Sequence, residues 1–487
     1  MRAKAIQRIE NERLLLAAVT VALLLLALSV KVTGGPFMAA GVAVVVPTLA
    51  WACMKPKRLV YLLIGYCCVY PFLISDLGFP RLLSYGGDLI NLLAVYFALR
   101  SGKLRSVRWG LLPVPLIGFF LVALFSAILR DISPLLFVWE ARNVFRFFLF
   151  LLACVGLLDI DDLRQILRLL FIVFLINIVL CSYESLVLHY GQDNTNGLFG
   201  SGSGGNASTN ILLLEMTCLA LFGYGYKVVN LPSLLLVIAG SCWVSVIAEL
   251  KFYYVQLVLL FALYLVISKP SLKNACLAVL LVVGLWVFIQ LFYTFMPGWD
   301  GFFDLNTMLE SSSQGGYGNN EGLNRLSAVA TIHSMFLKDT SSSLFGLGFG
   351  AGTYSQFFSA PLYNVWGETL HWTWFTDAQI FLETGYVGLI CYGLFFLVLG
   401  IHSLFLRRGL PDENIVMCNA GSVMSFFCIL LMVYNCVLTV DPGGYLIFLF
   451  LSFPFIVERD SNGAVRDEGA TGNAVFHKGC CVQAVNR

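Results

Sequence analysis

Apolar segments long enough to cross a membrane follow one another along almost the whole chain. A helix needs about 20 apolar residues to span the hydrocarbon core of a bilayer. The segments of this kind are 14–30, 36–54, 59–75, 83–99, 110–129, 135–158, 165–189, 210–226, 231–248, 252–268, 274–296, 376–405, 414–435 and 441–457. Only 12% of the residues are charged, against about 25% in soluble proteins. We therefore predict an all-α, polytopic membrane protein with about 12–14 transmembrane helices.

The distribution of lysine and arginine predicts how these helices are oriented. If the N-terminus lies in the cytoplasm, 22 of the 30 lysines and arginines fall in cytoplasmic segments, and the other eight lie outside. Cytoplasmic loops of membrane proteins carry such an excess of positive charge. We therefore predict that both the N- and the C-terminus are cytoplasmic.

One long polar segment, residues 297–375, interrupts the apolar pattern and is predicted to be extracytoplasmic. Loops of this length are generally functional or disordered, and a segment rich in Trp, Tyr, Phe and Gly is atypical of disorder. We predict that it folds as a cap on the membrane domain and carries the chemistry. The predicted division is 1–296, a transmembrane domain of about 11 helices; 297–375, the large loop; 376–457, the C-terminal transmembrane helices; and 458–487, a disordered cytoplasmic tail.

Charge and cysteine usage narrow the classes of function. The net charge of +2 gives no indication of a nucleic-acid partner. The 14 cysteines lie mostly inside apolar segments and lack metal-ligand spacing, which is typical of small buried hydrophobic residues. We predict no metal and no other cofactor.

Two arginines stand out among the cations on the predicted outer side. Arg142 and Arg146 lie four residues apart, so they share one face of a helix with Trp139. One interpretation is that they snorkel to the membrane interface, with Trp139 as an anchor. The other is a clamp for a phosphate or diphosphate, because arginine forks match such anions.

Two further outer cations are candidates for the same role. Lys251 follows Glu249 where one apolar segment meets the next, and charges at membrane depth usually face a cavity. The alternative is a short turn exposed to water. Arg325 begins a predicted helix that ends near residue 336, and its alternative is an ordinary surface charge.

The end of the polar segment carries candidate bases and aromatic rings. His371 and Asp377 are of the types that act as general bases, although Asp377 could also cap a helix. Trp372 and Trp374 offer faces on which sugars stack, and their alternative role is in an aromatic belt. The glycines of 345–352 match no nucleotide-binding fingerprint. They either let the backbone approach a ligand closely or form a flexible loop.

The order of three motifs resembles a known family. Asn324-Arg325 opens a helix, a glycine-rich run follows at 344–350, and Phe381-Leu-Glu-Thr-Gly-Tyr-Val-Gly-Leu389 enters an apolar segment. This order, within about 190–400, resembles the O-antigen ligase and polymerase superfamily of bacterial envelope polysaccharide enzymes.

The resemblance implies a GT-C-like, metal-independent, inverting glycosyltransferase at the outer face of the bacterial inner (plasma) membrane. The implied donor is an undecaprenyl-diphosphate-linked glycan, and the acceptor is a glycan or a lipid-linked glycan. Besides membrane lipids, a chain-length regulator or a flippase is the kind of partner implied. A base would deprotonate the acceptor hydroxyl, while a cation would stabilise the leaving diphosphate; Arg325 suits that role best, followed by Lys251, Arg142 and Arg146.

The chain also departs from the family pattern. Ligases often carry a His-Asn pair where this chain reads Trp374-Phe-Thr-Asp377, and an arginine is common at the position of Lys251. These departures favour a polymerase over a ligase and leave open whether His371 or Asp377 is the base. The alternative function is a transporter or flippase of lipid-linked oligosaccharide, which should place ionisable residues deep in many spans.

Overall fold

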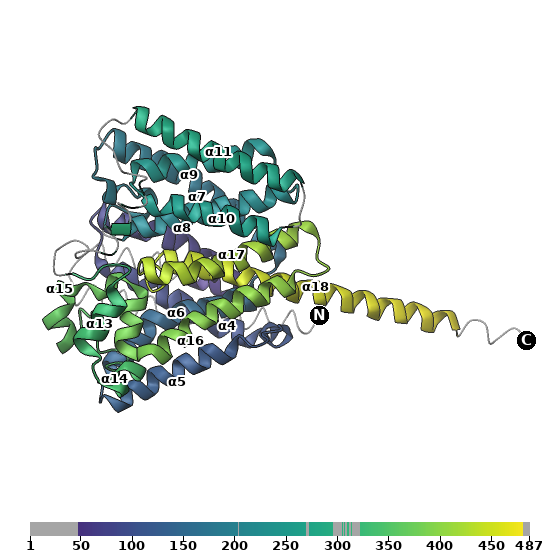
Figure 1. Cartoon of the computed structure of the whole chain (residues 1–487). Helices are drawn as coiled ribbons and strands as arrows, with labels where there is room; N and C mark the ends of the chain where they lie inside the picture. Colours follow the sequence, from purple (N-terminus) through teal and green to yellow (C-terminus); the bar gives the residue numbers. More distant parts are fainter. Residues whose placement is uncertain are drawn as a thin grey trace, which may run out of the picture.

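A computed structural model of the chain describes residues 47–202, 204–268, 272–295 and 322–480, with isolated positions between 304 and 313 (Figure 1). The predicted span 14–30, most of 36–54 and the first part of the predicted loop lie outside the described residues.

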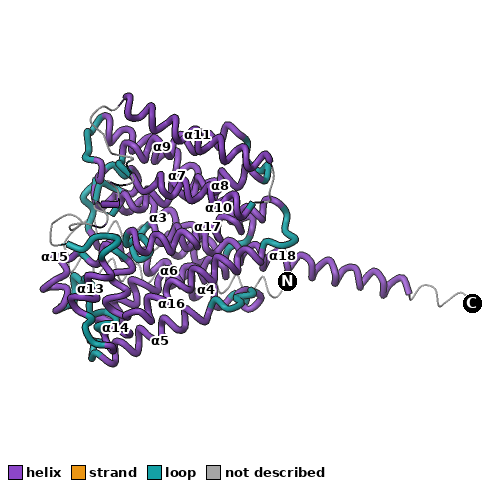
Figure 2. Tube along the Cα trace, viewed as in Figure 1, coloured by secondary structure: helices purple, strands orange, loops and turns teal. Residues whose placement is uncertain are grey.

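The described residues form helices and loops without a strand, and Figure 2 shows the helices packed side by side. The long helices are α3 (Lys57–Ser75), α4 (Gly86–Arg100), α5 (Pro113–Leu129), α6 (Pro134–Leu157), α7 (Ile160–Leu186), α8 (Gly205–Gly225), α9 (Leu231–Ile247), α10 (Lys251–Ile267), α11 (Leu272–Phe295), α16 (Thr376–Leu406), α17 (Asp412–Tyr434) and α18 (Gly443–Cys480). Each predicted span from 59–75 onward coincides with one of them. The prediction of an all-α fold is confirmed for the described residues.

Several of these helices have the length and apolarity of membrane spans. In the described part of the chain, six qualify: Lys57–Ser75, Arg81–Arg100, Ile160–Leu186, Gly205–Gly225, Thr376–Leu406 and Asp412–Tyr434. The apolar helices α5, α9 and α10 are shorter. These helices indicate a membrane-embedded protein, whereas the total of 12–14 spans stays a prediction.

Local sequence signals explain where several helices begin. Pro134 occupies the first turn of α6, where its missing N–H costs no hydrogen bond. Asp159 and Asp162 form a reciprocal capping box at the start of α7. The Asn230 side chain accepts a hydrogen bond from the Ser233 N–H at the start of α9.

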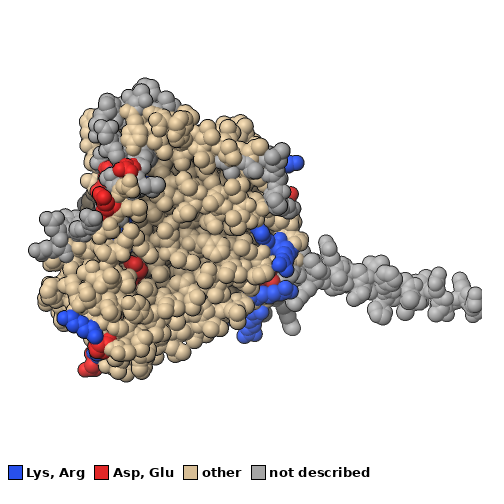
Figure 3. Space-filling model, in the orientation of Figure 1, with Lys and Arg blue, Asp and Glu red and all other residues tan. Residues whose placement is uncertain are grey.

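Positive charge gathers at one end of the bundle. Figure 3 shows lysines and arginines clustered near the point where α18 leaves the bundle. Ion pairs connect helices at this end: Lys57 of α3 lies 2.7 Å from Asp162 of α7, and Arg164 of α7 lies 2.9 Å from Glu413 of α17. On the face that Figure 3 shows, a smaller group of basic side chains lies at the opposite end of the bundle.

The described part of the polar segment, 322–375, folds at the opposite end (Figure 1). It contains α13 (Ala328–Phe336), α14 (Thr340–Phe345), α15 (Glu368–Leu370) and short turns between them. Its side chains bury a separate apolar core with the first turns of α16, which includes Ile332, Leu370, Trp372 and Phe381. This part of the predicted loop is therefore folded.

The glycine-rich run lies against a break in α16. Gly385 has φ 63° and ψ −163° inside that helix, and the N–H groups of Leu347 and Gly348 donate to the carbonyls of Leu382 and Glu383. A Cβ on Gly346, which also has positive φ, would lie 2.3 Å from the Glu383 carbonyl carbon. Gly346 and Gly385 let two protein backbones approach each other. That the glycine-rich run also approaches a ligand stays a prediction.

Helix α18 continues from the buried bundle to Cys480 and so runs into the predicted tail, 458–487. The disorder of that tail stays a prediction. Extending an existing helix needs no new nucleus, and the Arg459 guanidinium anchors this stretch by donating to the carbonyls of Val155 and Leu158. The last seven residues lie outside the described residues.

Candidate functional site

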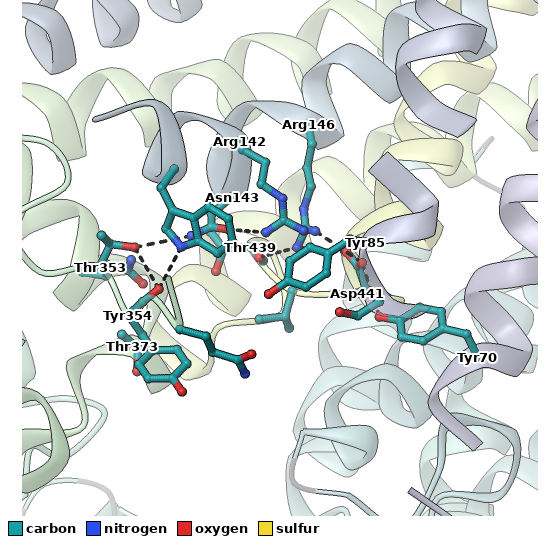
Figure 4. Close-up of a pocket in the computed structure, with 15 residues that line it drawn as sticks. Tyr70, Tyr85, Arg142, Asn143, Arg146, Thr353, Tyr354, Thr373, Thr439 and Asp441 are labelled. Carbon is teal, nitrogen blue, oxygen red and sulfur yellow. Dashed lines mark hydrogen bonds and ion pairs between the residues drawn. The ribbon is translucent and has the colours of Figure 1, made fainter. Parts of the chain in front are cut away.

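A pocket of about 340 Å³ lies beside the folded polar segment, which contributes Thr353, Tyr354, Gln356 and Thr373 to its lining. Helix α6, the connection between α17 and α18, and residues of the polar segment contribute its walls (Figure 4). Its lining combines aromatic rings, hydroxyls and amides with two arginines and one aspartate: Tyr70, Ser84, Tyr85, Trp139, Arg142, Asn143, Arg146, Thr353, Tyr354, Gln356, Thr373, Gln379, Thr439, Val440 and Asp441. A polar pocket of this composition suits a ligand with hydroxyl groups and negative charge.

Arg142 is held in place by a carboxylate and two aromatic rings. Its Nε and Nη2 donate to Asp88 of α4 at 2.8 and 2.5 Å. Its guanidinium carbon lies 5.0 Å from the centre of the Tyr85 ring and 5.1 Å from that of Trp139. Cation–π contacts of this kind orient a guanidinium, so Arg142 faces the pocket rather than a lipid interface.

Arg146, one turn further along α6, is more deeply buried. Its Nη2 lies 3.0 Å from Asp441 Oδ1 and donates to the Thr439 carbonyl at 3.2 Å. Its Nη1 lies 3.6 Å from Asp88, which it therefore shares with Arg142. The two arginines form one network with two aspartates, as Figure 4 shows for Asp441, and the predicted pairing of Arg142 with Arg146 on one face is confirmed.

Asp441 is a carboxylate that sequence reasoning missed. It lies in the connection between α17 and α18, where Asp441-Pro442-Gly-Gly reads as an ordinary turn. Its side chain is 6% exposed and accepts a hydrogen bond from the Tyr70 hydroxyl at 3.3 Å. Burial raises the pKa of Asp441, while the neighbouring Arg146 opposes that shift. The sequence did contain one indication of this role. Asp441 begins the last predicted span at its outer end, on the same predicted side of the membrane as Arg142.

The predicted cations do not gather in one place. The guanidinium carbon of Arg325 lies 4.6 Å from the centre of the Tyr434 ring, which stacks on Phe252 of α10. Lys251 pairs with Glu249 at 3.0 Å. Neither Arg325 nor Lys251 lines the pocket. Of the four cations predicted to bind the diphosphate, Arg142 and Arg146 line this pocket. The ranking of Arg325 first and Lys251 second for that role stays a prediction.

The two predicted bases also lie outside the pocket lining. The His371 ring stacks on Trp374, with ring centres 3.9 Å apart, and partial burial lowers the pKa of His371. Asp377 is 4% exposed and accepts a hydrogen bond from the Ala378 N–H at 2.7 Å, a local contact that resembles its alternative role at a helix start. Their neighbours Thr373 and Gln379 line the pocket instead.

One ring that was predicted to stack on sugars is buried in the protein. Trp372 is fully buried, and its indole N–H donates to the Gly352 carbonyl at 2.8 Å. It therefore belongs to the core of the polar segment and offers no face to a ligand, which corrects its predicted role. Trp374 is 38% exposed, but one face is covered by His371. The rings that line the pocket are those of Tyr70, Tyr85, Trp139 and Tyr354.

No protein-family model and no curated protein matches this chain. Within the described ranges, no group of three or more His, Cys, Asp or Glu side chains is placed to hold a metal ion. Fold and site together define a membrane-embedded helical protein with a polar, arginine-containing pocket at one end.

Proposed function

We propose that this chain is a membrane glycosyltransferase that polymerises or transfers glycan units carried on undecaprenyl diphosphate. The observation that supports this most strongly is the pocket, which combines Arg142 and Arg146 with a carboxylate and aromatic rings. Guanidinium groups suit a diphosphate, and the aromatic and amide groups suit a sugar. The pocket lies at the end opposite the cationic cluster, so the positive-inside rule favours the outer face of the inner membrane.

The proposed reaction uses Asp441 as the base, in place of His371 or Asp377. The Asp441 carboxylate takes the proton from an acceptor hydroxyl, whose oxygen attacks the anomeric carbon of the donor sugar. The bond from that carbon to the diphosphate oxygen breaks, and the diphosphate leaves with the electron pair. Arg142 and Arg146 stabilise the charge that develops on the leaving group. A polymerase or a ligase would share these steps.

Replacing Arg142 by Gln is expected to slow glycan extension about 100-fold, because one donor to the leaving diphosphate is lost. Purified protein in proteoliposomes would receive a lipid-diphosphate-linked repeat unit, and glycan length would be followed on a gel, with and without a chelator. Arg81→Gln is the matched control, since Arg81 is exposed and does not line the pocket. An Arg142→Gln variant as active as this control would contradict the proposed site.

A carrier of lipid-linked glycan is the second candidate, and Glu215 is the observation that favours it. Glu215 lies in the middle of α8 and is fully buried, and among the described residues neither of its carboxylate oxygens has a hydrogen-bond partner. An ionisable group at such a depth often marks the path of an ion or proton in a carrier.

Glu215→Gln separates the two functions. For a glycosyltransferase whose site is the pocket, we expect extension within about two-fold of wild type, because a neutral amide replaces the acid at low cost. Transfer of fluorescent lipid-linked unit across the vesicle bilayer would be measured in parallel. Transfer by the wild type that Glu215→Gln abolishes, without any extension, would replace the enzyme proposal by the carrier.

A further inference from the structure

Behind the pocket lies a buried carboxylate that the proposed reaction does not use. Glu140 of α6 is fully buried. Its Oε2 accepts a hydrogen bond from Asn143 Nδ2 at 3.2 Å, and its Oε1 accepts one from Gln379 Nε2 at 2.9 Å. Both amide side chains line the pocket. Glu140 therefore determines how two groups that face a ligand are turned.

The Asn143 amide is fixed from two sides. Arg142 Nη1 donates to Asn143 Oδ1 at 2.8 Å, and a guanidinium can only donate. The Asn143 nitrogen must therefore face Glu140, which accepts at Oε2. A carboxylate accepts at both oxygens, so the Gln379 amide also turns its nitrogen toward Glu140.

This arrangement leaves the oxygen of the Gln379 amide to serve the pocket. Gln379 lies on the first turns of α16 and is 7% exposed, so its amide is nearly sequestered from bulk water. A buried carbonyl oxygen is an acceptor for a hydroxyl or amide donor of the ligand. The rings of Trp139 and Tyr354 line the same pocket.

We propose that Gln379 and Glu140 form a hydroxyl-recognition subsite for the carbohydrate. The amide oxygen of Gln379 accepts a hydrogen bond from one sugar hydroxyl, and Glu140 is the positioning residue that holds the amide in this orientation. The inference rests on the proposed function, because it takes a carbohydrate as the ligand. A site built to bond a hydroxyl discriminates strongly against an analogue that lacks it.

The test pairs a protein change with a change in the substrate. The substrates are lipid-diphosphate-linked units that each lack one hydroxyl, and kcat/KM for extension is measured for each. Wild type is expected to lose about 10- to 100-fold on one of these units. Gln379→Met should lose a similar factor on the parent unit and show no further loss on that deoxy unit. An equal loss on every unit, including the deoxy units, would overturn the subsite. Gln165→Met is the matched control, because Gln165 is exposed and does not line the pocket.

Glu140 is tested by exchanging the pair. In Glu140→Gln the amide of Gln379 is free to turn over, and discrimination between the parent and the deoxy unit should fall. In the double variant Glu140→Gln with Gln379→Glu, donor and acceptor are exchanged: the amide at position 140 donates to the carboxylate at position 379, whose other oxygen can face the pocket. Discrimination should therefore recover relative to both single variants. Recovery of thermal stability without recovery of discrimination would show that Glu140 is merely structural and would overturn its positioning role.

Binding keeps failure of the subsite distinct from failure of the proposed reaction. The shift in Tm of the detergent-solubilised wild type and Gln379→Met would be measured with the same lipid-linked units. If wild type binds but does not extend them, the proposed reaction is wrong, and loss of the parent-to-deoxy difference in Gln379→Met still supports the subsite. If wild type extends them without a Gln379-dependent difference, only the subsite fails. If wild type binds none of them, both fail.

Discussion

Asp441→Asn is expected to slow glycan extension by about 10²- to 10⁴-fold, the range that a positioned general base contributes. Asparagine keeps the shape of the side chain but cannot accept the proton of the acceptor hydroxyl. The measurement is the initial rate of extension in proteoliposomes at matched protein content. Asp131→Asn is the control, because Asp131 is exposed and lies outside the pocket. Full activity of Asp441→Asn would return the search for the base to His371 and Asp377.

The pH dependence of the extension rate provides a second test of Asp441 as the base. Only the ionised carboxylate accepts a proton, so the rate should fall on acidification, with a midpoint above the ordinary aspartate pKa of about 3.9 because burial raises the pKa of Asp441. A raised carboxyl pKa favours the folded state below the unfolded pKa, and this contribution is lost as pH rises through the folded pKa. Acidification therefore lowers activity through this group without lowering its contribution to stability. The acid limb of the pH profile should disappear in Asp441→Asn.

Arg146→Gln is expected to lower the free energy of unfolding by about 3–5 kcal/mol, because it leaves the buried Asp441 without its charged partner. Arg146 is 10% exposed and Asp441 6%, so solvent screens the pair little. The loss would be measured as a decrease in thermal and denaturant stability in detergent. Arg142→Gln should cost less, since its partner Asp88 keeps its contact with Arg146.

The double variant Arg146→Gln with Asp441→Asn provides the internal check. Removing both charges removes the cost of an unpaired buried ion, so the double variant should be more stable than Arg146→Gln alone. If the single arginine variant were already as stable as wild type, the buried ion pair would not be structurally important.

The helices could be predicted from the sequence because each one is encoded by a run of consecutive apolar residues. The pairing of Arg142 with Arg146 was predictable for the same reason, since four residues span about one helical turn. Asp441 and Glu140 were not, because their importance arises from contacts with residues far away in sequence. Asp441 reaches Arg146, 295 positions distant, and Glu140 reaches Gln379, 239 positions distant. No periodicity in the sequence encodes those encounters.

Aromatic residues illustrate the same limit. Trp372 and Trp374 lie two positions apart and were predicted to have the same role. In the structure, Trp372 is fully buried, whereas Trp374 is 38% exposed. The separation of Arg325 and Lys251 from the arginines of α6 likewise depends on how the helices are arranged rather than on residue type. Composition singled out the polar segment, and the three-dimensional arrangement determines which of its side chains reach the pocket.

The close contact between the glycine-rich run and the break in α16 bears on how such proteins can be engineered. Gly346 and Gly385 allow the two backbones to lie in contact, because a Cβ on either glycine would clash with the other backbone. Arg130, which follows α5, donates a hydrogen bond to the Gly346 carbonyl at 3.2 Å. The described part of the polar segment, 322–375, is thus joined to the bundle at Gly346 as well as at its connection to α16. Grafting it onto another bundle would require transplanting the broken helix with it, so the natural unit of exchange between related proteins is the segment together with α16.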